Sequence, residues 1–255
     1  MRTIRITLQY DGTAYRGWQR QLSDDTIQAR IEDCIAKITG ESANVMGAGR
    51  TDAGVHALGQ VASFRTSSAL PSSTLARAMN ARLPDDIRIM EAREVGDDFH
   101  ARHDASGKTY RYIISNGRVL SPFLHRYAWM VPCPLDAASM ASAAEVLTGR
   151  HDFSSFRGAG CSSRNPVRTL STLKVERTDG ISCFGFPVDG VFYTVTAEAE
   201  AFMRHMVRNI VGTLVETGRG KITVQDVRGI LEGRDRRLAG PTAPPQGLFL
   251  DRVHY

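Results

Sequence analysis

The spacing of apolar and polar residues predicts a strand at the start of the chain and a helix after it. Over residues 4–10 apolar side chains fall at every second position, which is typical of a half-buried strand. From 27 to 38, isoleucines and a cysteine recur on one helical face. Asp25 is the predicted N-cap of this helix with Gln28 as its capping-box partner, and Gly40 ends it.

Both halves of the chain contain strand patterns as well as helix patterns. A hairpin is predicted from strands at 182–188 and 191–199, joined by a tight turn at Asp189-Gly190. The helix predicted over 202–212 carries Arg204 and Arg208 one turn apart, on a face that periodicity alone assigns to solvent. Further strands are predicted at 61–64, 87–89, 108–114, 173–175 and from Gly247, and further helices begin at Pro71, Asp136 and Thr223.

The densest cluster of candidate chemistry is the glycine-rich stretch 47–56. Its glycines permit close backbone approaches, so the loop can hold Asp52 against a bulky ligand. Arg50 and Asp52 are two positions apart, and in an extended segment their side chains point to the same side. The guanidinium can then pair with the carboxylate and keep it ionised, as a covalent nucleophile requires. A surface turn with a solvated Arg–Asp pair fits the same residues.

Composition and charge indicate a soluble globular protein with a basic surface. The chain has 255 residues, 42% hydrophobic and 23% charged, and a formal net charge of +5. Arginine supplies the excess positive charge and suits bidentate phosphate contacts, so a nucleic-acid partner is favoured, although many basic proteins bind none. The first residues lack an apolar signal core, and no apolar run is long enough to cross a membrane, so a cytoplasmic location is expected.

The four cysteines lie far apart in the sequence, without CxxC spacing, so we expect neither a zinc site nor a disulfide framework. His100 and His103 could suggest a metal or acid–base site, but structural histidines or a phosphate contact are favoured because zinc spacing is lacking. His151-Asp152 with the following serines could suggest a hydrolase triad, but no Gly-x-Ser-x-Gly elbow frames either serine.

The segment Gly49-Arg50-Thr51-Asp52-Ala53-Gly54-Val55-His56 resembles the signature of the tRNA pseudouridine synthase A family. Other segments match the same family in order, from Tyr10-Asp11-Gly12 to the final Val253-His254-Tyr255. The resemblance implies an α+β protein with the pseudouridine synthase fold, in which two similar α/β halves are joined through a mainly antiparallel central sheet with a positively charged cleft between them. It places the N-terminal half at 1–106 and the C-terminal half at 107–255.

The resemblance also implies the site. Asp52 would be the catalytic nucleophile, attacking C1′ of the ribose or C6 of the uracil, or abstracting the C2′ proton in a glycal route. Tyr110 would stack on the target uracil and could shuttle a proton through its hydroxyl. Arg208 would pair with Asp52, and Arg50 would favour its ionised form. The substrate would be uridine at positions 38, 39 and 40 of the tRNA anticodon stem-loop, the enzyme a homodimer, and no cofactor or metal would be required.

Two other functions remain open from the residues themselves. A non-catalytic RNA-binding protein would carry the same basic loops. A glycosidase would need a second carboxylate roughly 5–10 Å from Asp52, and none is evident nearby in the sequence. Tyr15 to Arg20 interleaves aromatics with arginines, which fits either base stacking or aromatics tucked into the core. The candidate RNA contacts are Arg16, Arg20, Arg102, Arg164, Arg168 and the run 234–237.

Overall fold

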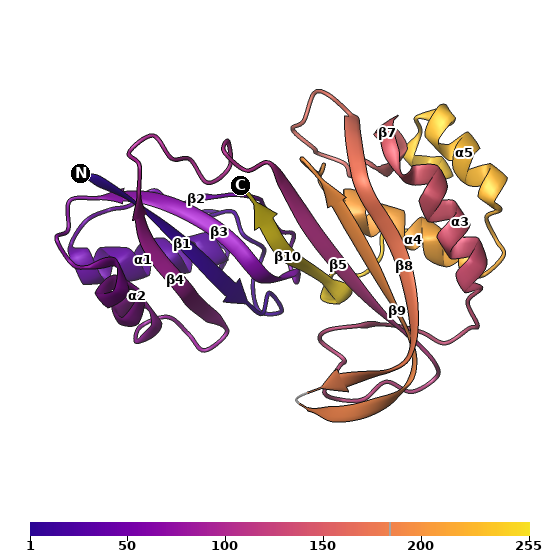
Figure 1. Ribbon diagram of the computed structural model, residues 1–255, viewed down its shortest axis with the longest axis horizontal. Coiled ribbons are helices and arrows are strands. Elements are labelled where there is room, and N and C mark those ends of the chain that lie inside the picture. Colours follow the sequence, from indigo (N-terminus) through magenta and orange to yellow (C-terminus); the bar gives the residue numbers. More distant parts are fainter. Residues whose placement is uncertain (184) are drawn as a thin grey trace. The chain divides into compact units, whose positions relative to one another are not determined.

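Residues 1–108 together with 249–255 form one structural unit, and residues 109–248 form a second (Figure 1). The computed structural model describes residues 1–183 and 185–255. Within these, ten strands, mostly antiparallel, and five α-helices are present, which confirms the mixed α/β class. Residues 249–255, assigned to the C-terminal half from the sequence, lie in the first unit because Phe249 and Leu250 pair with His56 and Ala57.

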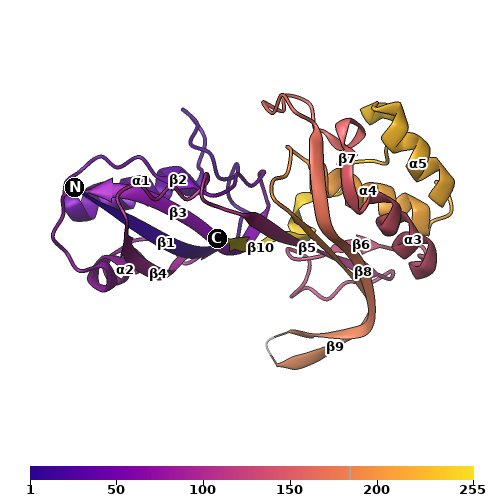
Figure 2. The same ribbon diagram turned by 45° about the horizontal axis from the view of Figure 1, so that its top comes forward.

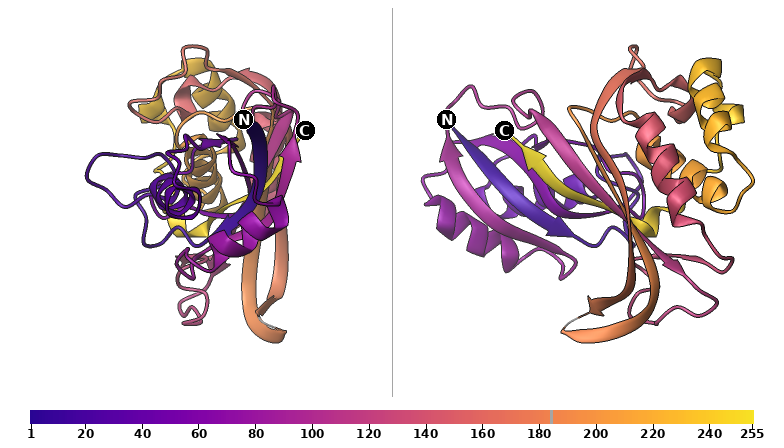
Figure 3. Two further views of the ribbon diagram at one scale, coloured as in Figure 1. Left: turned by 90° about the vertical axis from the view of Figure 1, so that its left-hand side faces the viewer. Right: turned by 45° about the vertical axis from the view of Figure 1, so that its right-hand side comes forward.

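The first unit is a sheet in the order β4-β1-β3-β10, with β2 beside β3. Strand β1 is antiparallel to both of its neighbours, and its apolar side chains Ile4, Ile6 and Leu8 are fully buried. The two helices of the unit lie on one face of this sheet (Figures 1 and 3). The elements are β1 (Arg2–Tyr10), α1 (Ile27–Thr39), β2 (Met46–Gly47), β3 (His56–Thr66), α2 (Ser72–Asn80), β4 (Ile87–Val95) and β10 (Leu248–His254).

The second unit is a sheet in the order β5-β9-β8-β7, with β6 parallel to β5. Three α-helices pack together on it, and β8 and β9 form a long hairpin (Figure 2). Its elements are β5 (Gly107–Asn116), β6 (Trp129–Val131), α3 (Ala137–Leu147), β7 (Gly149–Asp152), β8 (Val167–Cys183), β9 (Phe186–Ala199), α4 (Met206–Gly218) and α5 (Val224–Gly233), with short 3-10 turns at Ser154–Phe156, Arg236–Leu238 and Pro245–Gly247.

The cap predicted for the first helix is wrong. Thr26, not Asp25, is the N-cap of α1, and its hydroxyl accepts a hydrogen bond from the amide of Ala29. Asp25 instead pairs with Arg30, and Gln28 turns inward to the carbonyl of Val45. The predicted stop is confirmed, because Gly40 adopts a left-handed conformation at the C-cap.

A hairpin is present, but it is not the predicted one, because residues 186–188 of the first predicted arm and all of the second arm, 191–199, lie on the same strand, β9. Asp189 is inside β9, where it pairs with Gly180, and the pairing of β8 with β9 extends to Cys183 and Phe186. Gly190, with a φ of 140°, lies within an irregularity in the β8–β9 register. The Asp189-Gly190 pair therefore marks a bulge within the strand, which has the same composition as a turn.

Candidate active site

Asp52 lies in the loop between β2 and β3, and residues of three other segments hold the part of this loop that precedes the carboxylate. The Tyr10 and Thr51 hydroxyls share a 2.8 Å hydrogen bond, and the Trp18 amide donates to the Thr51 carbonyl at 3.0 Å. The side-chain amide of Gln60 donates to the carbonyl of Gly49 at 2.8 Å. The Asp52 side chain itself is half-buried. The loop therefore presents one partly shielded carboxylate from a fixed backbone.

Glycines allow a second loop, residues 11–17, to lie directly against the Asp52 loop. A β-carbon on Gly12 would lie 2.0 Å from the Val55 carbonyl oxygen, and one on Gly17 would lie 2.6 Å from the Thr51 carbonyl oxygen. Gly17 also has a φ of 93°. Side chains at these positions would force the two backbones apart, so the glycines set the position of Asp52 through contact.

The aromatic residues of the first loop are part of the core. Tyr15 and Trp18 are 5% and 2% exposed, and a β-carbon on Gly47 would lie 2.5 Å from the Trp18 ring. Their rings therefore cannot stack on bases, and the alternative that they pack inward is correct. Of the two arginines in the predicted contact loop, Arg16 is exposed, whereas Arg20 pairs with Glu32 and Asp33.

Arg50 differs from the prediction. Its side chain is exposed, and it makes no hydrogen bond or ion pair within the described ranges 1–183 and 185–255. The predicted pair with Asp52 is therefore not formed. The spacing argument assumed an extended strand, but residues 50–52 belong to no strand and lie between bends at Ala48 and Gly49 and a turn at Ala53 and Gly54. Arg50 is exposed, whereas Asp52 is half-buried.

His56, the last residue of the signature, has a structural role in the same unit. It is 1% exposed, and its ring stacks on Phe249 of β10 at a centroid distance of 4.8 Å. Its Nδ1 accepts a hydrogen bond from the Gly12 amide at 3.1 Å, and a carboxylate oxygen of Asp11 lies 3.1 Å from the same atom. The histidine thus joins the 11–17 loop to the start of β3.

Two predicted site residues, Tyr110 and Arg208, belong to the second unit. Tyr110 lies on β5, is 6% exposed, and contacts the edge of Phe202 at a centroid distance of 5.1 Å. The guanidinium of Arg208 donates from Nε to the Ala243 carbonyl at 2.7 Å, and the Ala243 amide donates to the Arg208 carbonyl at 3.1 Å. Both side chains are therefore held in one orientation by their own unit.

The segment 240–243 can reach Arg208 because glycine lets it lie on α4. A β-carbon on Gly212 would lie 1.7 Å from the Pro241 carbonyl oxygen. Below this contact, the fully buried Asn209 accepts hydrogen bonds from Arg236 and Thr242 at 3.0 and 2.7 Å. Sequence periodicity did not reveal Asn209, since it falls among the apolar residues of the helix.

The prediction that Arg204 and Arg208 lie one turn apart on the same helix is wrong. Helix α4 begins at Met206, and His205 before it has a left-handed φ of 60°. Arg204 therefore lies outside the helix, where its carbonyl accepts a hydrogen bond from the Gly158 amide at 2.8 Å. The apolar pattern includes Met203, which is buried, so the sequence predicted a helix that already contains this residue. The helix begins only three residues later, at Met206.

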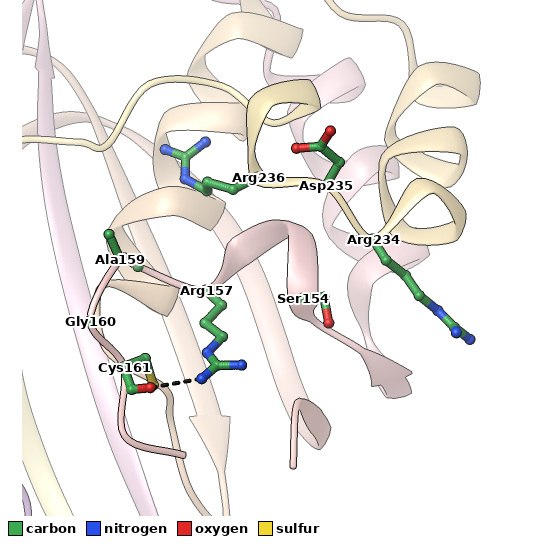
Figure 4. Close-up of a pocket in the computed structure, with 9 residues that line it drawn as sticks. Ser154, Arg157, Ala159, Gly160, Cys161, Arg234, Asp235 and Arg236 are labelled. Atoms are coloured by element: carbon green, nitrogen blue, oxygen red, sulfur yellow. Dashed lines mark hydrogen bonds between the residues drawn. The ribbon is translucent and has the colours of Figure 1, made fainter. Parts of the chain in front are cut away.

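A basic pocket of about 680 Å³ lies in the second unit, between the segment 154–161 and the segment 234–236 (Figure 4). Arg157 donates to the carbonyl of Cys161 at 2.7 Å, and Arg234 lies 3.2 Å from Asp152. Arg236 is a structural residue, because it donates to the Ala239 and Gly240 carbonyls as well as to Asn209, and burial lowers its pKa. Arg157 and Arg234 are thus the remaining cations of this pocket, which Asp235 also lines.

The other candidate sites have structural roles. Asp152 accepts hydrogen bonds from the amide and hydroxyl of Ser154, and His151 contacts the Thr148 carbonyl, so they form no hydrolase triad. His100 accepts hydrogen bonds at Nδ1 from the amides of Arg102 and His103. In the part of the chain that the structure describes, no group of three or more His, Cys, Asp or Glu side chains is placed to hold a metal ion.

Comparison with known proteins identifies the family. The sequence profile described as tRNA pseudouridine synthase matches residues 6–104 and 143–255, including the Asp52 loop and α4. The chain belongs to the tRNA pseudouridine synthase family. It is 46% identical over 255 residues to the tRNA pseudouridine synthase A of Acetivibrio thermocellus, covering 100% of both chains. It is 44% identical to that of Myxococcus xanthus, covering 100% of this chain and 92% of the relative.

A third relative in this pseudouridine synthase family is the tRNA pseudouridine synthase A of Rhodospirillum rubrum, 46% identical over 254 residues, covering 98% of this chain and 87% of the relative. The likeness therefore extends over both structural units and not only over the Asp52 signature. None of the helices among residues 1–183 and 185–255 combines the length and apolar character that crossing a membrane requires.

Proposed function

We propose that this protein is an isomerase that converts uridine to pseudouridine in tRNA, at positions 38, 39 and 40 of the anticodon stem-loop, with Asp52 as the nucleophile. The observation that carries the proposal is the half-buried Asp52 carboxylate, held in the family's signature loop by Tyr10, Trp18 and Gln60. A fixed, partly shielded carboxylate is suited to covalent catalysis, because little reorganisation is needed at the moment of reaction.

The reaction needs no external reagent. The N1–C1′ bond of uridine breaks, the uracil turns, and C5 bonds to C1′ while the proton on C5 moves to a base and N1 gains a proton. Atoms and electrons therefore balance within the substrate and water. Asp52 attacks C1′ or C6, or takes the C2′ proton, and in each route it starts as the ionised carboxylate.

Tyr110 and Arg208 are proposed to act on the same uridine. The Tyr110 ring, fixed edge-on by Phe202, would stack on the uracil after the base leaves the helical stack, and its hydroxyl would carry a proton. Arg208, oriented by Ala243, would supply a positive charge that keeps the Asp52 carboxylate ionised. Arg50, exposed and without a protein partner in the described chain, is proposed to contact the RNA.

The basic pocket around Arg157 and Arg234 and the exposed Arg16 and Arg164 are proposed to contact phosphates of the tRNA. Arg168 is less suited, because it is tied to Asn165 and Ser163. The protein is further proposed to act as a homodimer. Sedimentation velocity at micromolar concentration tests this, with a species of twice the chain mass expected and a monomer contradicting it.

The substrate assignment is tested by mapping pseudouridine in tRNA transcripts incubated with the purified protein. We expect modification of uridines 38, 39 and 40 and none in a transcript with cytidine at these positions. Pseudouridine at other positions would refute the site assignment. Tight binding to tRNA with no pseudouridine formed would instead identify a non-catalytic RNA-binding protein.

A further inference from the structure

Arg5 of β1 carries a positive charge that no acid of the protein compensates. It lies between the fully buried Ile4 and Ile6, so its side chain points to the open face of the first-unit sheet, which α1 and α2 do not cover (Figure 3). Its Nε is buried without a hydrogen-bond partner, and within residues 1–183 and 185–255 the side chain makes no hydrogen bond and no ion pair. Buried polar atoms without partners are rare in native proteins, so Arg5 is a candidate for ligand binding.

Two aromatic rings fix the Arg5 guanidinium in place. Its central carbon lies 4.5 Å from the centroid of the Tyr255 ring and 5.9 Å from that of Phe99. Tyr255 is itself anchored, because its hydroxyl donates to the Ala101 carbonyl at 2.7 Å. The Ala101 amide donates to the Ser63 hydroxyl at 3.1 Å, and Ser63 is the partner of Arg5 in the β1–β3 register. Cation–π contacts therefore orient the charge but satisfy none of its N–H donors.

A second arginine lies directly opposite Arg5 on the neighbouring strand. Arg93 of β4 is its register partner, so their β-carbons are about 4.5–5.5 Å apart on the same face. Arg65 of β3 is opposite Thr3, which places it diagonally from Arg5 at about 7–8 Å. Arg65 and Arg93 are exposed and make no hydrogen bond or ion pair in the described part of the chain. Arg5, Arg65 and Arg93 thus form an arginine cluster, in which the directly opposed like charges destabilise the sheet.

The acids near this cluster do not neutralise it. Glu91 is two residues from Arg93 in β4 and faces the same way, but among the described residues it forms no ion pair. Asp97 and Asp98 follow the end of β4, and in the same part of the chain neither carboxylate pairs with an arginine. The charge of the cluster therefore remains available to an anionic ligand.

We propose that the arginine cluster binds the phosphate backbone of RNA on the open face of the first-unit sheet. Tyr255 occupies one face of the Arg5 guanidinium, so the terminal N–H groups remain as donors in the planar fork that suits phosphate. Arg5 and Arg93 would share one phosphate, and Arg65 would bind a neighbouring one. All three belong to the first unit. The choice of ligand rests on the proposed function, because it takes the RNA to be the tRNA substrate.

The salt dependence of tRNA binding tests this site. In a plot of the logarithm of the association constant against the logarithm of the salt concentration, Arg93→Gln should reduce the slope by about 0.7 to 0.9, the value for one lost phosphate contact. The affinity should fall roughly tenfold, as for loss of a hydrogen bond to a charged group. Arg77→Gln is the matched control, because it removes an exposed arginine of α2, on the other face of the same sheet, and should change neither quantity.

Two further variants test the geometry of the cluster. Arg93→Glu replaces the opposed like charges by a cross-strand pair of opposite charges, so its melting temperature should rise above that of the wild type while tRNA binding weakens more than in Arg93→Gln. Arg5→Met keeps an apolar contact with Tyr255 and removes the charge. It should show the same loss of slope as Arg93→Gln.

Each outcome decides the proposal. Equal slopes in the wild type, Arg93→Gln and Arg5→Met would overturn it, and a lower affinity with an unchanged slope would show a structural role instead. A lower melting temperature in Arg93→Glu would show that the two arginines do not face each other, which also overturns the cluster. If the wild type binds tRNA and the variants lose slope but no pseudouridine is formed, the phosphate site stands and the proposed isomerase function fails. If pseudouridine is formed and all slopes are equal, only the phosphate site fails.

Discussion

The phenol oxygen of Tyr10 and the hydroxyl oxygen of Thr51 lie 2.8 Å apart, and both side chains are buried. Tyr10 ends the first strand of the protein, and Thr51 directly precedes Asp52. This hydrogen bond therefore ties the end of β1 to the residue next to the carboxylate. Because Tyr10 is buried, its pKa is raised, so the hydroxyl remains protonated and can keep this contact at any physiological pH.

Thr51→Val should weaken catalysis more than stability. The substitution keeps the shape and removes the hydroxyl, at a cost of about 0.5–1.5 kcal/mol for the lost hydrogen bond. The turnover number should fall by up to about 100-fold, because small displacements of a reacting group are costly. Thr169→Val, at an exposed strand position, is the control and should match the wild type in single-turnover assays. Equal turnover in Thr51→Val would mean that the hydroxyl does not position Asp52.

Gly47→Ala should destabilise the first unit. Its new β-carbon would meet the buried Trp18 ring at 2.5 Å, and overpacking of this kind costs about 1–3 kcal/mol. Gly229→Ala is the matched control, since no atom lies within 4 Å of a β-carbon at that position of α5. That control should be more stable by about 0.5–1 kcal/mol, because alanine favours the helix. Thermal unfolding checks both, and a stable Gly47→Ala would show that Trp18 can move.

Asn209→Ala should destabilise the second unit by roughly 2–4 kcal/mol, because it leaves buried groups without partners. The side chain donates to the Phe156 carbonyl at 2.8 Å and accepts from Arg236 and Thr242. Asn44→Ala, at an exposed position, should change stability by less than about 0.5 kcal/mol. Loss of the melting transition of the second unit would agree with this account, and equal melting of the two variants would refute it.

The pH dependence of stability should differ between the wild type and Lys108→Met. Burial lowers the folded-state pKa of Lys108 from its ordinary value of 10.5, so the unfolded chain binds more protons between the two values. The wild type should therefore gain stability relative to Lys108→Met as pH rises through this window. The advantage of Lys108→Met should be full below the lowered pKa and vanish above 10.5. Denaturant unfolding at several pH values measures it, and a pH-independent difference would contradict it.

The strands and most helix faces could be predicted because burial imposes its period on the sequence. The alternation over β1 and the stripe Val227, Ile230 and Leu231 of α5 are examples that the structure confirms. Caps and turns were harder, since Thr26 and Asp25 are both good N-caps and Asp189-Gly190 fits a bulge as well as a turn. Local composition does not decide which of two adjacent residues caps a helix, or whether a residue pair forms a turn or a bulge, because tertiary contacts decide it.

The sequence predicted where the candidate site lies but not the contacts that hold it in place. The signature identified the Asp52 loop, yet neither the contact of Gly12 with Val55 nor that of Gly212 with Pro241 is visible in any local pattern. Each joins segments that lie about 30 residues or more apart in the chain.

The central claim is that the Asp52 carboxylate performs the reaction. The most direct test measures tritium release from tRNA carrying 5-tritiated uridine, because tritium leaves C5 only when C5 bonds to the ribose. We predict release by the wild type and none above background by Asp52→Ala, with tRNA binding retained. Equal release by the wild type and by Asp52→Ala would contradict the account.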